Sequence, residues 1–228
     1  EGGRSPHKSQ NCMNCCSPTS ALVAAPIKMS GPKIAIVYYS MYGHIRTMAT
    51  AVKKGIEAAG GTATMLQVAE TLPAEVLSKM GAPPKSDDPV VDAASLTDYD
   101  GIIFGIPGRF GTFPAQFKAF WDSTGGLWQG GKLVGKPAGV FASVGTQGGG
   151  QETIGLTMVT QFTHHGMVFV PLGYQDPKVF SYEEVHGATP YGAGTFAGAD
   201  GSRKPTQLEL DVAETQGKTF CGIAAKLK

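Results

Sequence analysis

The chain has 228 residues, of which 42% are hydrophobic and 16% charged, and its formal net charge is +1. A chain of this length can bury one sizeable core, and the near-neutral charge argues against a nucleic-acid-binding protein. No uninterrupted apolar run approaches the ~18 residues that a membrane-spanning helix needs, so the sequence predicts a soluble protein.

Residues 1–31 have no periodic pattern and are rich in Ser, Pro, Asn and Gly, so we expect a disordered leader before a single domain at residues 32–228. Cys12, Cys15 and Cys16 lie in this leader. Three interpretations stay open: incidental thiols in a tail, S-acylation that brings the protein to a membrane, and metal binding. Because no second ligand pair follows the Cys12 and Cys15 spacing, we expect no metal site.

The remaining cysteine, Cys221, stands alone in the expected core, which is typical of a protein from a reducing compartment. The short apolar piece at residues 21–27 contains Pro26 and is a poor signal-peptide core. We therefore expect a cytoplasmic protein, peripheral at a membrane if the leader is acylated.

The first structured unit is expected at residues 33–60. The apolar, β-rich run 34–39 is typical of a parallel strand that is buried on both faces. Apolar residues then recur at three- and four-residue steps from Met48 to Ala59, which predicts a helix that ends at Gly60. Between them, Ser40–Ile45 offers a hydroxyl and a permissive glycine at a helix start, where unsatisfied N–H groups favour a phosphate monoester. A turn that binds nothing is the competing interpretation.

The same alternation continues along the chain, with Pro114 expected in the first turn of the helix after the third strand. Strands are expected at 62–68, 101–106, 137–143 and 167–170. Helices are expected at 74–80, across Phe117, Phe120 and Trp121, at 151–164 and at 206–227. This order predicts an α/β protein with a parallel sheet covered on both faces.

Ligands of such sheets bind beyond the carboxyl ends of the strands. The loops after the first, third and fourth expected strands are rich in glycine, hydroxyl-bearing and aromatic residues. With a phosphate on the first loop and a flat ring between the other two, they describe a mononucleotide of flavin shape. Glycine permits this because the backbone can approach the ring closely where no Cβ intervenes.

Six segments resemble the flavodoxin-like NAD(P)H:quinone oxidoreductases of the WrbA type. They are YYSMYGH (38–44), IIFGIPGRFG (102–111), FWDSTGGLW (120–128), GTQGGGQET (145–153), HHGMVFVPLGY (164–174) and TPYGAGTFAGADGSRKP (189–205). The resemblance implies a five-stranded parallel sheet of order 2-1-3-4-5 that binds FMN. It also implies NADH or NADPH as co-substrate and a homo-oligomer, typically a tetramer, whose pockets are built from more than one subunit.

The resemblance also implies roles for individual residues. FMN would be held by Ser40, Met41, Tyr42, Gly43, His44, Ile45, Pro107, Gly108, Arg109, Phe110, Ser143, Val144, Gly145, Thr146, Gln147, Gly148, Gly149 and His164. Tyr42, Phe110 and Trp128 would line the place where nicotinamide and quinone alternate over the flavin. Where the family usually has Thr, this chain has Gly108, so one side-chain hydroxyl is absent.

Three residues have a competing structural interpretation. Arg109 could be a solvated charge, although its place past a strand end favours a ligand contact. One of His164 and His165 suits a helix cap. Trp128 lies among glycines, which favours an aromatic wall for a planar substrate, whereas Trp121 lies at helical spacing from Phe117 and is expected in the core. Tyr174, Tyr191 and the segment 176–195 have no assigned role.

The implied activity is two-electron reduction of quinones to hydroquinones by ping-pong hydride transfer through flavin N5, with protection against oxidative stress as the physiology. His164 or a pocket tyrosine would supply a proton. The alternatives are a flavodoxin-like electron carrier, which an acidic docking face would indicate, and a flavoprotein scaffold or signalling protein recruited to a membrane by the leader.

Overall fold

The computed structural model describes residues 2, 3 and 31–228. The hypotheses about Cys12, Cys15 and Cys16 fall outside these residues. The strands are β1 Lys33–Tyr38, β2 Thr62–Gln67, β3 Gly101–Pro107, β4 Pro137–Val144, β5 Val168–Phe169 and β6 Gly194–Phe196. The helices are α1 His44–Ala58, α2 Ala74–Lys79, α3 Ala115–Ser123, α4 Gly125–Gln129, α5 Gln151–His164 and α6 Gln207–Leu227, with 3-10 turns η1 Ala93–Asp98 and η2 Pro177–Phe180.

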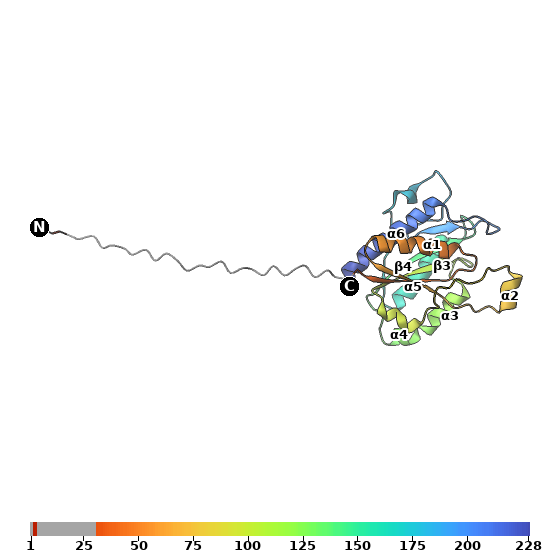
Figure 1. The fold of residues 1–228 in the computed structure, drawn as a ribbon, viewed down its shortest axis with the longest axis horizontal. Coiled ribbons are helices and arrows are strands. Elements are labelled where there is room, and N and C mark those ends of the chain that lie inside the picture. The colour runs from red at the N-terminus through yellow and green to blue at the C-terminus, as the bar shows by residue number, and fades with distance from the viewer. Residues whose placement is uncertain (1, 4–30) are drawn as a thin grey trace.

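The strands form one parallel sheet whose order β2-β1-β3-β4-β5 confirms the prediction (Figure 1). The sheet has one strand more than predicted. The short β5 pairs only with Pro137 and Ala138 at the start of β4, and β6 pairs with Ala142–Val144 at its end. Three residues are too few to show an alternating pattern, so β6 carried no signal in the sequence.

Helices cover both faces of the sheet, with α1 and α6 on one side and α3, α4 and α5 on the other (Figure 1). The periodic apolar positions of α1, among them Met48, Val52 and Ile56, are fully buried against the sheet and α6. The backbones of α1 and α6 meet at Gly217, where a Cβ would lie 2.1 Å from the Val52 carbonyl oxygen. Helices α1 and α6 can therefore pack closely only because position 217 has no side chain.

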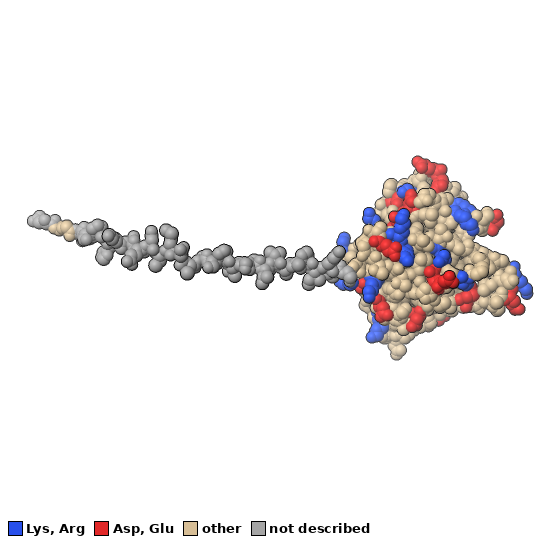
Figure 2. All heavy atoms as spheres, viewed as in Figure 1, with Lys and Arg blue, Asp and Glu red and all other residues tan. Residues whose placement is uncertain are grey.

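Most predicted elements agree with the structure to within a residue or two, and two local predictions need correction. Pro114 precedes α3 as its N-cap residue and does not lie in the first turn. Trp128 lies on the short helix α4 and not in a loop, because Thr124 accepts backbone hydrogen bonds from Leu127 and Trp128. Within the described residues, no helix has the length and apolar character to cross a bilayer. On the face seen in Figure 2, acidic and basic side chains are interspersed.

Candidate functional site

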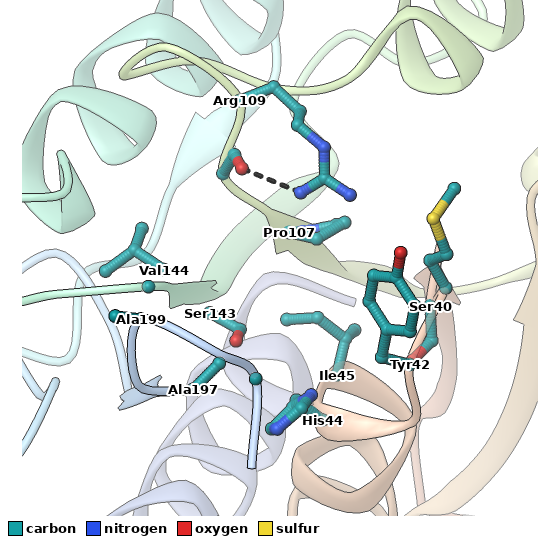
Figure 3. Close-up of a pocket in the computed structure, with 14 residues that line it drawn as sticks. Ser40, Tyr42, His44, Ile45, Pro107, Arg109, Ser143, Val144, Ala197 and Ala199 are labelled. Carbon is teal, nitrogen blue, oxygen red and sulfur yellow. Dashed lines mark hydrogen bonds between the residues drawn. The ribbon is translucent and has the colours of Figure 1, made fainter. Parts of the chain in front are cut away.

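A cavity of about 290 Å³ lies at the carboxyl ends of β1, β3 and β4 (Figure 3). Its volume is near the lower end of the roughly 300–1,000 Å³ range of small-molecule sites. Most of its lining residues were predicted from the sequence, and Ala197, Ala199 and Gly201 were not. The lining consists of Ser40, Met41, Tyr42, His44, Ile45, Pro107, Gly108, Arg109, Ser143, Val144, Gly145, Ala197, Ala199 and Gly201.

One wall is the loop Ser40–Ile45, which we term the phosphate loop. Gly43 takes a φ of 92° as the N-cap of α1, a left-handed conformation that favours glycine. The Ser40 hydroxyl oxygen accepts from the N–H of Gly43 at 3.1 Å and of Arg46 at 3.4 Å. Among the described residues, no acceptor lies within bonding distance of the His44 and Ile45 N–H groups. These free donors at the positive end of a helix are the donor set that a phosphate monoester requires.

The opposite wall comes from the ends of β3 and β4. The Gly108 N–H donates to the Ser143 carbonyl at 2.7 Å, which holds the two loops together. A Cβ on Gly108 would lie 2.7 Å from Val144 Cγ1 and 2.8 Å from Ile154 Cδ1. The glycine that replaces the family's usual Thr is therefore matched by the packing of its neighbours. The Arg109 guanidinium donates to the Gly108 carbonyl at 2.9 Å, as Figure 3 shows.

Phe110 lies beside the cavity but does not line it. Arg109 and Thr112 pair as an antiparallel bridge, which places Phe110 and Gly111 in a two-residue turn with φ values of 52° and 78°. A positive φ is strained for an aromatic residue, and the ring is fully exposed at the tip of the turn. The Thr153 hydroxyl donates to the Gly111 carbonyl at 2.7 Å and braces this turn.

Several predicted residues are not part of the cavity lining within one chain. Gly43 and the loop residues Thr146, Gln147, Gly148 and Gly149 adjoin it. Helices α3 and α5 run back from the carboxyl ends of the strands that precede them (Figure 1). Trp128 on α4, which follows α3, and His164 at the end of α5 therefore lie toward the amino-terminal ends of the strands. The length of α5 alone puts His164 about 20 Å from the start of that helix. Trp128 is 60% exposed.

His165 rather than His164 is the C-cap residue of α5. Its Nε2 lies 2.9 Å from the Thr124 hydroxyl, and its ring centroid lies 5.5 Å from that of Trp121. Burial and the neighbouring His164 lower the pKa of His165. Trp121 is buried, which confirms the prediction that it belongs to the core.

The third wall is a segment that the sequence did not assign, residues 194–206, which we term the strap. It begins with β6, which pairs with β4, and contributes Ala197, Ala199 and Gly201 to the lining. In Figure 3 the strap lies on the side of His44 and Ser143, and Arg109 lies on the opposite side. The one sequence signal near it is the capping box of Thr206 and Glu209, which predicts the start of α6 but no ligand site.

Beneath the phosphate loop, Glu70 accepts hydrogen bonds from Tyr39, Lys85 and Gln116 at 2.7, 2.7 and 2.9 Å. Burial opposes the ionised carboxylate, but the hydrogen bonds outweigh it and lower the pKa of Glu70 to about 2. Burial and the bond to Glu70 raise the pKa of Tyr39. The Lys85 ammonium lies 3.4 Å from the Ser40 carbonyl oxygen, so this cluster supports the phosphate loop from below.

The His44 side chain has a partner that the sequence analysis did not predict. Its Nε2 lies 2.9 Å from the Arg203 carbonyl oxygen of the strap. Burial lowers the pKa of His44, although the Arg203 carbonyl partly opposes this. Since a carbonyl oxygen only accepts, Nε2 carries the hydrogen. The ring therefore joins the strap to the phosphate loop, and its backbone N–H is left for an anion.

A family model described as NADPH-dependent FMN reductase matches residues 32–175. Three curated relatives align with 86% of this chain. They are minor allergen Alt a 7 of Alternaria alternata (59% identity, 98% of its length), quinone-oxidoreductase QR2 of Triphysaria versicolor (58%, 97%) and NAD(P)H quinone oxidoreductase PST3 of Candida albicans (55%, 99%).

Among solved structures, a WrbA-like flavodoxin protein from Agrobacterium tumefaciens superposes with a TM-score of 0.62 and 26% identity over 86% of this chain and 99% of that one. A flavodoxin from the domain Archaea gives a TM-score of 0.55 at 17% identity over 84% of this chain and 98% of that one, which supports the fold alone.

Proposed function

The chain belongs to the NADPH-dependent FMN reductase family, and from this premise we propose that it is an FMN-dependent NAD(P)H:quinone oxidoreductase. The observation that carries the proposal is the cavity where three loops meet. It combines free N–H groups at a helix start with glycines from the loops that follow β3 and β4. The donors suit the phosphate of FMN, and the backbone at Gly108 and Gly145 would allow close approach of its ring.

Different residues of the lining would bind different parts of FMN. The N–H groups of His44 and Ile45, with the Ser40 hydroxyl, would bind the phosphate. Arg109 is the permanently charged residue of the lining and would offset negative charge on the ring. When bound, FMN supplies the redox chemistry, since it accepts hydride from NAD(P)H and passes two electrons to a quinone.

Tyr42 lines the cavity and is 42% exposed, so a substrate could contact its ring from the solvent side. We infer that nicotinamide and quinone use this side in turn, because both must contact the same ring. Alternation in one place requires ping-pong kinetics, and two-electron delivery would protect against oxidative stress.

Trp128 and His164 would act on the cavity of a neighbouring copy, since neither lies near the cavity of its own chain. This supports a homo-oligomer, with the tetramer as the form that the family resemblance implies. Mixed oligomers of a Trp128→Ala, His164→Ala chain and a Gly43→Val chain should then recover quinone reductase activity that neither variant has alone. Activity that stays at the level of the separate variants would contradict shared sites.

The decisive experiment is FMN titration of the purified protein, followed by NADH- and NADPH-dependent reduction of benzoquinone. We expect quenching of FMN fluorescence, turnover with at least one nucleotide and parallel lines in double-reciprocal plots. Tight FMN binding without turnover on either nucleotide would favour the electron-carrier alternative. Failure to bind FMN would reject both.

A further inference from the structure

The strap is folded over the cavity by backbone pairing along its own length. Thr195 and Phe196 lie in register with Ser143 and Val144 of β4. The Ala197 N–H donates to the Val144 carbonyl at 2.8 Å, and the Arg203 N–H returns to the Ala197 carbonyl at 2.9 Å. Residues 197–203 therefore form a closed loop whose lining residues face the cavity.

This loop is held from behind by Glu209, whose side chain is fully buried. Its carboxylate accepts from the Thr195 hydroxyl at 2.7 Å and from the Thr206 N–H at 2.9 Å. It also accepts from the Gly187 N–H at 3.1 Å and the Phe196 N–H at 3.4 Å. A single side chain of α6 thus bonds to both ends of the strap.

Arg203 balances the charge of this carboxylate. Its Nη1 lies 3.1 Å from both Glu209 oxygens and 2.7 Å from the Phe196 carbonyl, and its Nη2 donates to the Val185 carbonyl at 2.8 Å. Breaking a buried ion pair is costly because it leaves an uncompensated charge. Neither Arg203 nor Glu209 lines the cavity, so neither contacts a ligand there.

The same residue connects the strap to the phosphate loop. The Arg203 side chain bonds to Glu209, and its carbonyl accepts from His44, which lies 159 positions earlier in the sequence. His44 opens α1 directly after the left-handed Gly43. A displacement of Arg203 must therefore move both the strap and the hydrogen bond that fastens it at the start of α1.

We propose that the strap retains the cofactor, and that Glu209, Arg203 and the His44 ring are positioning residues that set how slowly the cofactor leaves. The proposal rests on the proposed function only in that FMN is the ligand. Because the strap forms a wall of the cavity, its loosening must open an exit without changing the residues that contact the phosphate and ring. The effect is therefore expected in the dissociation rate.

The test measures FMN release by fluorescence after dilution, together with hydrogen exchange at the Ala197 and Arg203 amides of the same protein. Arg203→Lys keeps the charge beside Glu209 but loses the forked contacts, which protects the fold from an unpaired carboxylate. We expect FMN to leave at least tenfold faster and both amides to exchange faster. Lys54→Met is the matched control, because it breaks a 2.7 Å ion pair between α1 and α6 away from the strap.

A second pair of variants tests the fastening hydrogen bond. His44→Gln keeps a side-chain N–H that can reach the Arg203 carbonyl, and His44→Leu does not. We expect slow FMN release in the first and fast release in the second.

The proposal is overturned if the amides of Arg203→Lys exchange faster while FMN leaves at the wild-type rate, or if neither quantity changes. Faster FMN release with unchanged amide exchange would also overturn it. A wild-type protein that binds no FMN would reject the proposed function instead, and the exchange measurement would still decide whether the ion pair holds the strap.

Discussion

The phosphate loop and the strap line the same cavity and are built in different ways. The phosphate loop is six consecutive residues, and its shape follows from Gly43, the Ser40 hydroxyl and the start of α1. The strap is held by contacts with other segments. These are the ion pair between Arg203 and the buried Glu209, and the hydrogen bond between the His44 ring and the Arg203 carbonyl oxygen. The shape of the phosphate loop depends on residues that are close in the sequence, and the position of the strap depends on contacts between distant parts of the chain.

Because of this difference, we expect substitutions in the two walls to have different effects on ligand binding and on stability. A change in the phosphate loop alters ligand contacts at little cost to the rest of the fold. A change behind the strap affects the fully buried Glu209 carboxylate, so a substitution that leaves this carboxylate unpaired should impair folding and binding together. The following substitutions separate these cases, from the largest expected effect to the smallest.

Gly192→Ala should have the largest effect. Gly192 precedes the strap, and a Cβ there would lie 1.8 Å from the Val140 carbonyl oxygen of β4. A carbonyl oxygen in a central strand cannot move away from a new Cβ as the end of a flexible side chain can. We therefore expect a loss of about 3 kcal/mol in the free energy of unfolding, together with weaker FMN binding. Urea unfolding and FMN titration measure both. Gly222→Ala on the open face of α6 is the control and should be neutral or stabilising by roughly 0.5–1 kcal/mol.

Gly108→Ala should cost less, because the atoms it meets are the side-chain ends of Val144 and Ile154. We expect about 1–2 kcal/mol of destabilisation. A second substitution, Val144→Ala, should restore part of it, and a double-mutant cycle on urea midpoints measures the coupling. Purely additive effects would show that Gly108 is not packed against Val144.

Gly43→Ala and Gly60→Ala form a matched pair at the two ends of α1. Both glycines have a positive φ, 92° and 83°, and in both cases a Cβ meets no atom within 4 Å. We expect a similar loss of about 1 kcal/mol in stability from each. Only Gly43→Ala should weaken FMN binding, by about tenfold. Equal FMN affinities in the two variants would remove the phosphate loop from the site.

The smallest expected effect is the loss of stability when Glu70 is protonated at low pH. Because the pKa of Glu70 is lowered to about 2 in the folded protein, its ionised form contributes stability above the unfolded pKa of about 4.3. That contribution should be lost as the pH falls from about 5 to 2. Since the carboxylate stays partly exposed, we expect on the order of 1 kcal/mol.

Urea midpoints of the wild type and of Glu70→Gln should therefore differ at pH 7 and converge near pH 2. A constant difference across this range would show that ionised Glu70 does not brace the loop.

The sequence alone determined the alternation of strands and helices, the positions of the main helices and the loops that bear most of the cavity lining, while the strand order came from the family resemblance. These features depend on signals that lie within a few residues of one another, such as the apolar run before Ser40 and the helical spacing after it. The exposure of Phe110 was not foreseeable in this way, since it follows from a two-residue turn that Thr153 braces from another element.

Only the tertiary structure determined that the strap forms a wall of the cavity and that the His44 ring bonds to it. It alone also determined that Trp128 and His164 lie away from the cavity of their own chain. Glu209 is an unremarkable third residue of a helix in the sequence, and its role comes from burial and from hydrogen bonds with Gly187 and with the strap. His44 and Arg203 meet although 159 positions separate them. Such contacts, and the burial of a side chain, depend on how distant segments are brought together in space, which local spacing in the sequence does not encode.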